Sequence, residues 1–132
     1  MNELKLSYAS LRYEEPVVYI TFKQGSELGF PEMKELVQYA EALSGFKNYF
    51  VFSNVGDHVT VTPEGRRFAF NAKNSPYQKG TAVLVKNNVV SIAANLYVGF
   101  QQPDFPYKVF TEKQKAIDWL LSLPLQAEFK TG

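Results

Sequence analysis

The alternation of apolar and polar positions at the N-terminal end of the chain predicts two strands. From Leu4 to Tyr13 apolar residues alternate with polar ones, which is typical of a strand with one buried face. Val17 to Lys23 has the character of a second strand. Between them, Glu14-Glu15-Pro16 predicts a tight turn, because proline fixes φ and has no N–H to donate to a sheet. Residues 1–23 are therefore expected to form a hairpin.

Apolar positions at helical spacing predict four helices, at residues 31–45, 62–74, 88–100 and 111–123. Pro31 suits the first turn of the first helix, and Gly45 suits its end. Thr62 has the position of an N-cap for the second helix, with Pro63 at the first helical position. Residues 111–114, Thr-Glu-Lys-Gln, match the capping-box pattern and predict the start of the fourth helix.

Two short apolar runs without polar interruption predict inner strands that are buried on both faces. They extend from Tyr49 to Phe52 and from Gly80 to Val85. Tyr107 to Phe110 predicts a last short strand. The order β-β-α-β-α-β-α-β-α indicates one α/β domain over residues 1–132. Its mixed five-stranded sheet would consist of the N-terminal hairpin and three parallel βα units, covered by about four helices.

Composition and charge exclude several classes of function. The chain has 132 residues, 14 of them basic and 13 acidic, and a net charge of +1. No basic block exceeds the Arg66-Arg67 pair, so we expect no nucleic-acid partner. The absence of cysteine excludes disulfides, thiol catalysis and thiolate metal sites. The first residues lack the apolar core of a signal peptide, and no stretch approaches the roughly 20 apolar residues of a spanning helix, so we expect a cytoplasmic protein without an integral membrane segment.

Candidate catalytic chemistry is sparse. The one histidine, His58, could act as a base with Asp57 or Asn54, or as one ligand of a metal ion, which would make the protein a hydrolase or transferase. Further metal ligands, a nucleophile elbow and a phosphate-binding glycine loop are not evident. The favoured interpretation is that His58 is an ordinary loop residue, and that the protein is not an enzyme and needs no cofactor or metal.

The aromatic content is high, with 11 phenylalanines, 8 tyrosines and 1 tryptophan. Phe68 and Phe70 lie two positions apart on the predicted second helix, about 200° around its axis, so they cannot both face the sheet. One interpretation is an aromatic core. The other is an apolar patch or pocket between the second and third predicted helices, which would serve as a dimer interface or an apolar-ligand site. Its candidate residues are Phe68, Phe70, Tyr97, Phe100, Phe105 and Tyr107.

Several segments resemble bacterial SpoIIAA-like proteins of the STAS type. Residues 106–120 are similar to the P-x-K-V-F-x-x-x-x-x-A-x-x-W-L ending of that family. Residues 51–54 and 60–67 resemble its third strand and the helix start that follows, and residues 81–85 and 92–97 resemble the next βα unit. The resemblance implies a STAS-like fold and a non-catalytic, regulatory module that binds partner proteins, sometimes nucleotides. Some SpoIIAA-like relatives also resemble the lipid-carrying CRAL-TRIO fold.

In anti-sigma factor antagonists of this family, a serine at the start of the helix after the third strand is phosphorylated. An ungapped comparison puts Pro63 on the acceptor serine and Glu64 on the second serine, so the family's switch is not retained in its usual form. Thr60 or Thr62 could take its place after a shift of register. The leading hypothesis is thus a module that acts by protein–protein contact, with a possible homodimer. The alternative is a domain that binds an apolar small ligand or lipid.

Overall fold

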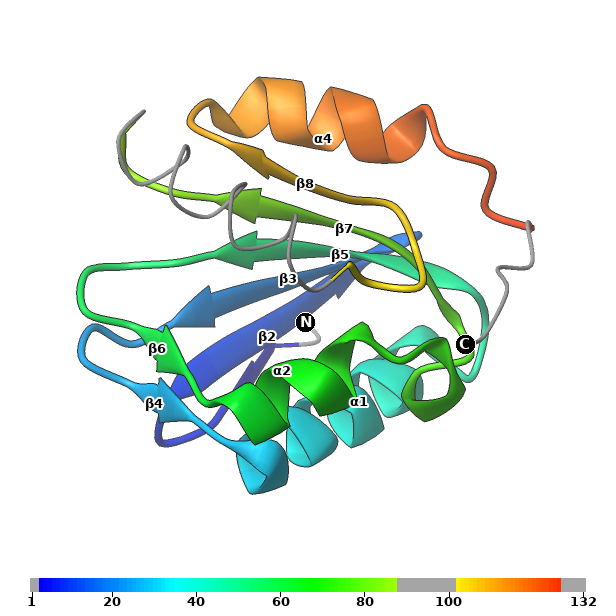
Figure 1. Ribbon diagram of the computed structural model, residues 1–132. Coiled ribbons are helices and arrows are strands. Elements are labelled where there is room, and N and C mark those ends of the chain that lie inside the picture. Colours follow the sequence, from blue (N-terminus) through cyan, green and yellow to red (C-terminus); the bar gives the residue numbers. More distant parts are fainter. Residues whose placement is uncertain (1–2, 88–101, 127–132) are drawn as a thin grey trace.

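The computed structural model describes residues 3–87 and 102–126. The predicted helix at 88–100 lies outside this range. The central element is a six-stranded sheet with the order β1-β2-β3-β5-β7-β8 (Figure 1). Its strands are β1 (Glu3–Lys5), β2 (Ala9–Glu14), β3 (Val17–Phe22), β5 (Tyr49–Asn54), β7 (Gln78–Leu84) and β8 (Tyr107–Phe110).

The directions of the strands confirm the predicted mixed sheet. β2 and β3 form an antiparallel hairpin in which Glu14 pairs with Val17. β3 pairs with β5, β5 with β7 and β7 with β8, and all three of these pairs are parallel. The two unbroken apolar runs are therefore adjacent parallel strands inside the sheet, as predicted.

The predicted number of five strands is wrong for the sheet, because the segment predicted as one strand from Leu4 to Tyr13 contains two. The chain turns between them, and Leu6 N donates to Ala9 O at 2.8 Å. β1 therefore pairs back onto β2 in antiparallel fashion, with Leu4 opposite Leu11. This turn contains neither glycine nor proline, so the apolar alternation continues across it. A second small sheet, which the sequence did not predict, pairs β4 (Glu27–Leu28) with β6 (Thr60–Val61).

Helix α1 spans Phe30–Ser44 and ends at Gly45, whose φ of 69° is left-handed. Helix α2 spans Pro63–Phe70. A 3-10 turn, η1 (Ala72–Asn74), follows it, so the region predicted as one helix at 62–74 is interrupted at Asn71. Helix α4 spans Lys113–Leu121. Within the described residues, no helix combines the length and the apolar character that crossing a membrane requires.

The helix starts differ in how well the sequence predicts them. Thr62 is the N-cap of α2, since its Oγ1 accepts a hydrogen bond from Gly65 N at 3.0 Å. The capping box predicted at 111–114 is wrong, because α4 begins one residue later and its N-cap, Glu112, makes no side-chain capping bond. Helix α1 has a capping bond that was not predicted: the carboxylate of Glu32, in the first turn, accepts a hydrogen bond from the N-cap backbone, Gly29 N, at 2.8 Å.

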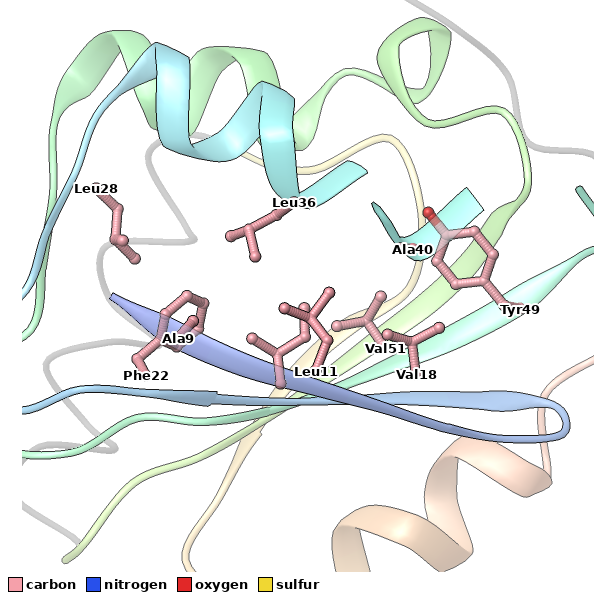
Figure 2. Packing of buried hydrophobic residues seen from close by; sticks show 10 residues of the cluster. Ala9, Leu11, Val18, Phe22, Leu28, Leu36, Ala40, Tyr49 and Val51 are labelled. Atoms are coloured by element: carbon pink, nitrogen blue, oxygen red, sulfur yellow. The ribbon is translucent and has the colours of Figure 1, made fainter. Parts of the chain in front are cut away.

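The sheet separates two layers of helices. In Figure 1, α1 and α2 cover one face and α4 covers the other. Along β5 the side chains alternate between these layers, so Tyr49 and Val51 join the core under α1 whereas Phe50 and Phe52 join the core under α4. Figure 2 shows the α1 side, where Leu36 and Ala40 of the helix face side chains that rise from the sheet.

Candidate functional site

A pocket of about 440 Å³ lies between the α1–α2 layer and the sheet. We call it the apolar pocket. Its floor consists of strand residues, namely Ile20, Phe22, Tyr49, Val51, Ser53, Gln78, Thr81, Val83 and Tyr107. The two helices provide Met33, Leu36, Val37, Ala40, Arg66, Ala69 and Phe70. Loops and the small second sheet add Leu28, Val55, Val59, Val61 and Phe105.

Local sequence pattern explains why these side chains converge. Met33, Leu36, Val37 and Ala40 follow the i, i+3, i+4, i+7 spacing that forms one face of a helix. The strands contribute alternate residues, because successive side chains of a strand point to opposite faces. Figure 2 shows Leu36 and Ala40 on the side of helix α1, and Val51 and Tyr49 on the side of the sheet.

Three of the six predicted aromatic residues line the apolar pocket: Phe70, Phe105 and Tyr107. Phe68 does not line it, and packs instead on Phe30 with the ring centroids 5.0 Å apart. The two phenylalanines of α2 thus point different ways, as their spacing requires. Tyr97 and Phe100 lie outside the described residues.

Asp104 ties the loop that carries Phe105 to the end of α2. Its backbone N donates to Phe70 O at 2.9 Å, and its carboxylate accepts from Ala72 N at 2.9 Å. The two bonds hold the next residue, Phe105, at 6% exposure in the pocket wall. The position of Phe105 therefore depends on the two hydrogen bonds of Asp104 as well as on burial of the phenylalanine ring.

Few polar groups reach the apolar pocket. On β7, the Thr81 hydroxyl donates to Gln78 Oε1, and Gln78 Nε2 donates to Ser75 Oγ at 3.3 Å. Ser53 contributes a hydroxyl from the middle of the sheet. Arg66 is the one charged side chain among the described lining residues, and its Nη2 donates to Val61 O at 3.4 Å.

The two tyrosines among the described lining residues, Tyr49 and Tyr107, remain protonated at neutral pH. Burial raises the pKa of Tyr107 to about 12, while the positive charge of Arg66 acts in the opposite direction. Burial also raises the pKa of Tyr49, and the negative charge of Glu41 adds to the increase. Both phenols are therefore neutral hydrogen-bond donors.

The structure does not orient His58 as a base. His58 lies exposed in the loop after β5, with a φ of 59°. Its neighbour Asp57 forms an ion pair with Lys86, with a separation of 3.0 Å, and Asn54 lines a second pocket of about 100 Å³ on the α4 face of the sheet. The part of the chain that the structure describes contains no group of three or more His, Asp or Glu side chains able to hold a metal ion.

The two candidate phosphorylation sites differ in environment. Thr60 is an exposed residue of β6. Thr62 is half-buried, and its hydroxyl is the cap of α2. Phosphorylation of either residue stays a prediction.

Comparison with known proteins places the chain in a family. The family described as "Domain of unknown function (DUF7793)" matches residues 11–124, which is most of the chain. The chain belongs to the DUF7793 family. No curated protein matches it.

The fold of this DUF7793 chain is SpoIIAA-like, as its resemblance to that family implies. It is similar to the crystal structure of an uncharacterized protein from Shewanella loihica PV-4, which belongs to the DUF3478 family and has a SpoIIAA-like fold. The two are 17% identical, with a TM-score of 0.55, over 85% of this chain and 91% of that one. At this level of identity the likeness shows the fold alone.

The sequence did not reveal the part that α1 plays in the apolar pocket of the DUF7793 chain. The aromatic surplus indicated a site between the second and third predicted helices, whereas α1 supplies four of the lining residues. An apolar stripe such as that of Leu36 and Ala40 has the same pattern whether it packs on a filled core or borders a space. The most distinctive feature of the sequence in this region was Arg66, a charged residue on an apolar helix face. The sequence alone did not show that this side chain borders a pocket.

Proposed function

We propose that this domain binds a small apolar ligand, without catalysis, in the apolar pocket. The observation that supports the proposal is a pocket of about 440 Å³ with a largely aliphatic and aromatic lining. Small-molecule sites are roughly 300–1,000 Å³ in volume, are mostly apolar, and contain a few well-placed polar groups. The apolar pocket has all three properties.

The character of the lining also supports occupancy by an apolar molecule. Water in the pocket gains little, because the described lining offers few hydrogen-bonding partners. An apolar ligand that displaces this water would remove apolar surface from solvent, which is favourable.

The hydroxyl groups of the pocket support binding rather than reaction. A serine or threonine nucleophile needs a neighbouring base. Ser53 and Thr81 line the pocket, but the described lining residues include no histidine, carboxylate or lysine. Burial of apolar ligand surface, at about 25 cal/mol per Å², would provide most of the affinity.

A neutral fluorescent probe tests the proposal directly. N-phenylnaphthylamine is apolar and uncharged, and its fluorescence rises in an apolar site. We expect it to bind with saturation at one site. Ala69→Phe should abolish binding, because Ala69 lines the pocket and the larger ring would occupy it. Ala42→Phe is the matched control, since Ala42 lies exposed on α1.

Two results would refute the proposal. One is the absence of any saturable probe binding by the unmodified chain. The other is that Ala69→Phe, shown to be folded by circular dichroism, binds the probe as well as Ala42→Phe does, which would indicate a site elsewhere.

A second candidate function, self-association through protein contact, is supported by Phe46. This side chain is 60% exposed, and its φ of 58° is left-handed, a conformation that costs a bulky residue about 1–2 kcal/mol. Its ring lies edge-on to Tyr77, with the centroids 6.3 Å apart, so the two rings form an aromatic patch at the end of α1. A strained and exposed aromatic residue suggests a role in contacts with another copy of the chain.

Phe46→Asn distinguishes the effect of Phe46 on the stability of the chain from its effect on self-association. Asparagine tolerates the left-handed conformation, so the isolated chain should not lose stability. The variant should, however, self-associate less than the unmodified chain in size-exclusion chromatography with light scattering. A monomeric unmodified chain at high concentration would contradict the candidate.

A further inference from the structure

We infer that the occupant of the apolar pocket is an amphipathic carboxylate, with its apolar body among the aliphatic side chains and its carboxylate at Arg66 and Tyr107. The inference deepens the proposed function and rests on it. It assigns a chemical class to the ligand and a role to two side chains.

The first argument is charge. Arg66 is the one charged side chain among the described lining residues, and it borders a wall of aliphatic and aromatic groups. A positive charge at the edge of an apolar pocket attracts an anionic group, because charges interact more strongly there than in bulk water. A carboxylate on the ligand is such a group. A guanidinium can serve several acceptors at once, so the bond from Arg66 to Val61 O is compatible with a carboxylate as a further acceptor.

The second argument is the state of Tyr107. Its phenol keeps its proton well above neutral pH, since its pKa is about 12. It is therefore available as a donor to a carboxylate oxygen. Arg66 and Tyr107 both line the apolar pocket, and Phe70, one helical turn after Arg66, packs on the Tyr107 ring with the centroids 5.2 Å apart. A guanidinium and a phenol together can donate to both oxygens of one carboxylate, and hydrogen bonds to charged acceptors are about twice as strong as neutral ones.

The third argument distinguishes the carboxylate from other head groups. The described lining contains no aspartate or glutamate, so it offers an ammonium head group no carboxylate partner, and the positive charge of Arg66 repels that group. An alcohol would gain only a hydrogen bond between neutral partners or one from Arg66. The rest of the lining, including Leu36, Val51 and Val83, suits a hydrocarbon body.

Competition among three amphiphiles of equal chain length provides the test. Decanoate, decanol and decylammonium are each titrated, below their critical micelle concentrations and at neutral pH, against the bound N-phenylnaphthylamine. We expect decanoate to displace the probe at about a tenfold or more lower concentration than decanol, because hydrogen bonds between charged partners are about twice as strong as neutral ones. Decylammonium should be the weakest competitor.

Substitutions at adjacent arginines identify the group responsible. Arg66→Gln should remove the preference for decanoate, and Arg66→Lys should retain part of it because it keeps the charge. Arg67→Gln is the matched control, since the Arg67 side chain is 62% exposed and lies 3.8 Å from Glu64. It should leave the preference unchanged.

The outcomes separate this inference from the proposed function. If decanoate and decanol displace the probe equally from the unmodified chain, the carboxylate assignment is overturned while apolar binding stands. If the probe itself does not bind, the proposed function fails and this inference fails with it. A preference for decanoate that survives Arg66→Gln would overturn the role of Arg66, and so would an equal loss of the preference in Arg67→Gln. The comparison on the unmodified chain does not depend on the folding of any variant.

Discussion

The ring of Phe70 meets the ring of Tyr107 edge-on, with the centroids 5.2 Å apart and the planes at 68°. Phe70 is the last residue of α2 and Tyr107 is the first residue of β8, so this contact joins the helix layer to the sheet across the apolar pocket. Because both rings line the pocket, the contact also fixes the shape of the wall next to Arg66.

A double-mutant cycle should detect the contact between these two rings. Phe70→Leu and Tyr107→Leu each remove one ring, and the pair should show a coupling energy of about 0.5–1.5 kcal/mol in urea unfolding. The control cycle pairs Phe68→Leu with Tyr107→Leu. Phe68 packs on Phe30, so these two changes should be additive within about 0.5 kcal/mol. Equal coupling in both cycles would contradict the assigned geometry.

Gly65→Ala should destabilise the fold. A Cβ at this position would lie 2.8 Å from Leu28 O and 3.0 Å from the carbonyl carbon of Gly29, and backbone atoms cannot move aside easily. Overpacking costs about 1–3 kcal/mol, whereas the gain in helix propensity is at most roughly 1 kcal/mol.

Gly56→Ala provides the control for this prediction. Its Cβ would meet only Phe22 O, at 3.8 Å, which is an ordinary contact. Thermal and urea unfolding should therefore show a loss of stability for Gly65→Ala and little change for Gly56→Ala. A neutral Gly65→Ala would mean that α2 does not approach the segment before α1 this closely.

Thr62→Ala should reduce the free energy of unfolding by about 1 kcal/mol, because it removes the oxygen that accepts from Gly65 N. Thr62→Ser keeps the hydroxyl and should stay near the unmodified value. Thr60→Ala is the matched control on the exposed strand β6, and it should change stability by no more than about 0.5 kcal/mol. Urea denaturation of the three variants compares these effects, and an equal loss in Thr60→Ala would argue against the cap.

Patterns that involve local backbone chemistry were predictable from the sequence. Pro16 placed the hairpin turn, Gly45 placed the end of α1 and Thr62 placed the start of α2, because each residue type favours one backbone conformation or bond. The unbroken apolar run of β5 predicted a strand with helices on both sides, since neither of its faces has a polar residue until Ser53.

Features that depend on distant contacts were not predictable. The turn after Leu6 has no glycine or proline to mark it, so the sequence predicted one strand where the structure has two. The apolar pocket depends on how far α1 and α2 stand from the sheet, which no single residue encodes. Phe70 was predicted as a candidate because it could not share a face with Phe68, but whether it filled a core or lined a space required the tertiary structure.

The stability of the fold should decrease at high pH in a way that depends on Tyr107. Its pKa of about 12 is above the value of about 10 for an unfolded tyrosine, so between these values the folded state holds a proton that the unfolded state loses. The contribution of Tyr107 is therefore complete below about pH 10 and is lost as the pH rises toward 12. Its upper limit is roughly 3 kcal/mol, and partial exposure of the side chain reduces it.

Ultraviolet difference titration of the unmodified chain against Tyr107→Phe isolates this phenol from the other tyrosines with raised pKa values, Tyr8, Tyr13 and Tyr49. The fall in unfolding free energy above pH 10 should be shallower in Tyr107→Phe. Arg66→Gln should raise the pKa of Tyr107 further, because the charge of Arg66 lowers it, and Arg67→Gln should not. A phenol at position 107 that titrates near pH 10 in the unmodified chain would contradict both its burial and its role as a neutral donor in the apolar pocket.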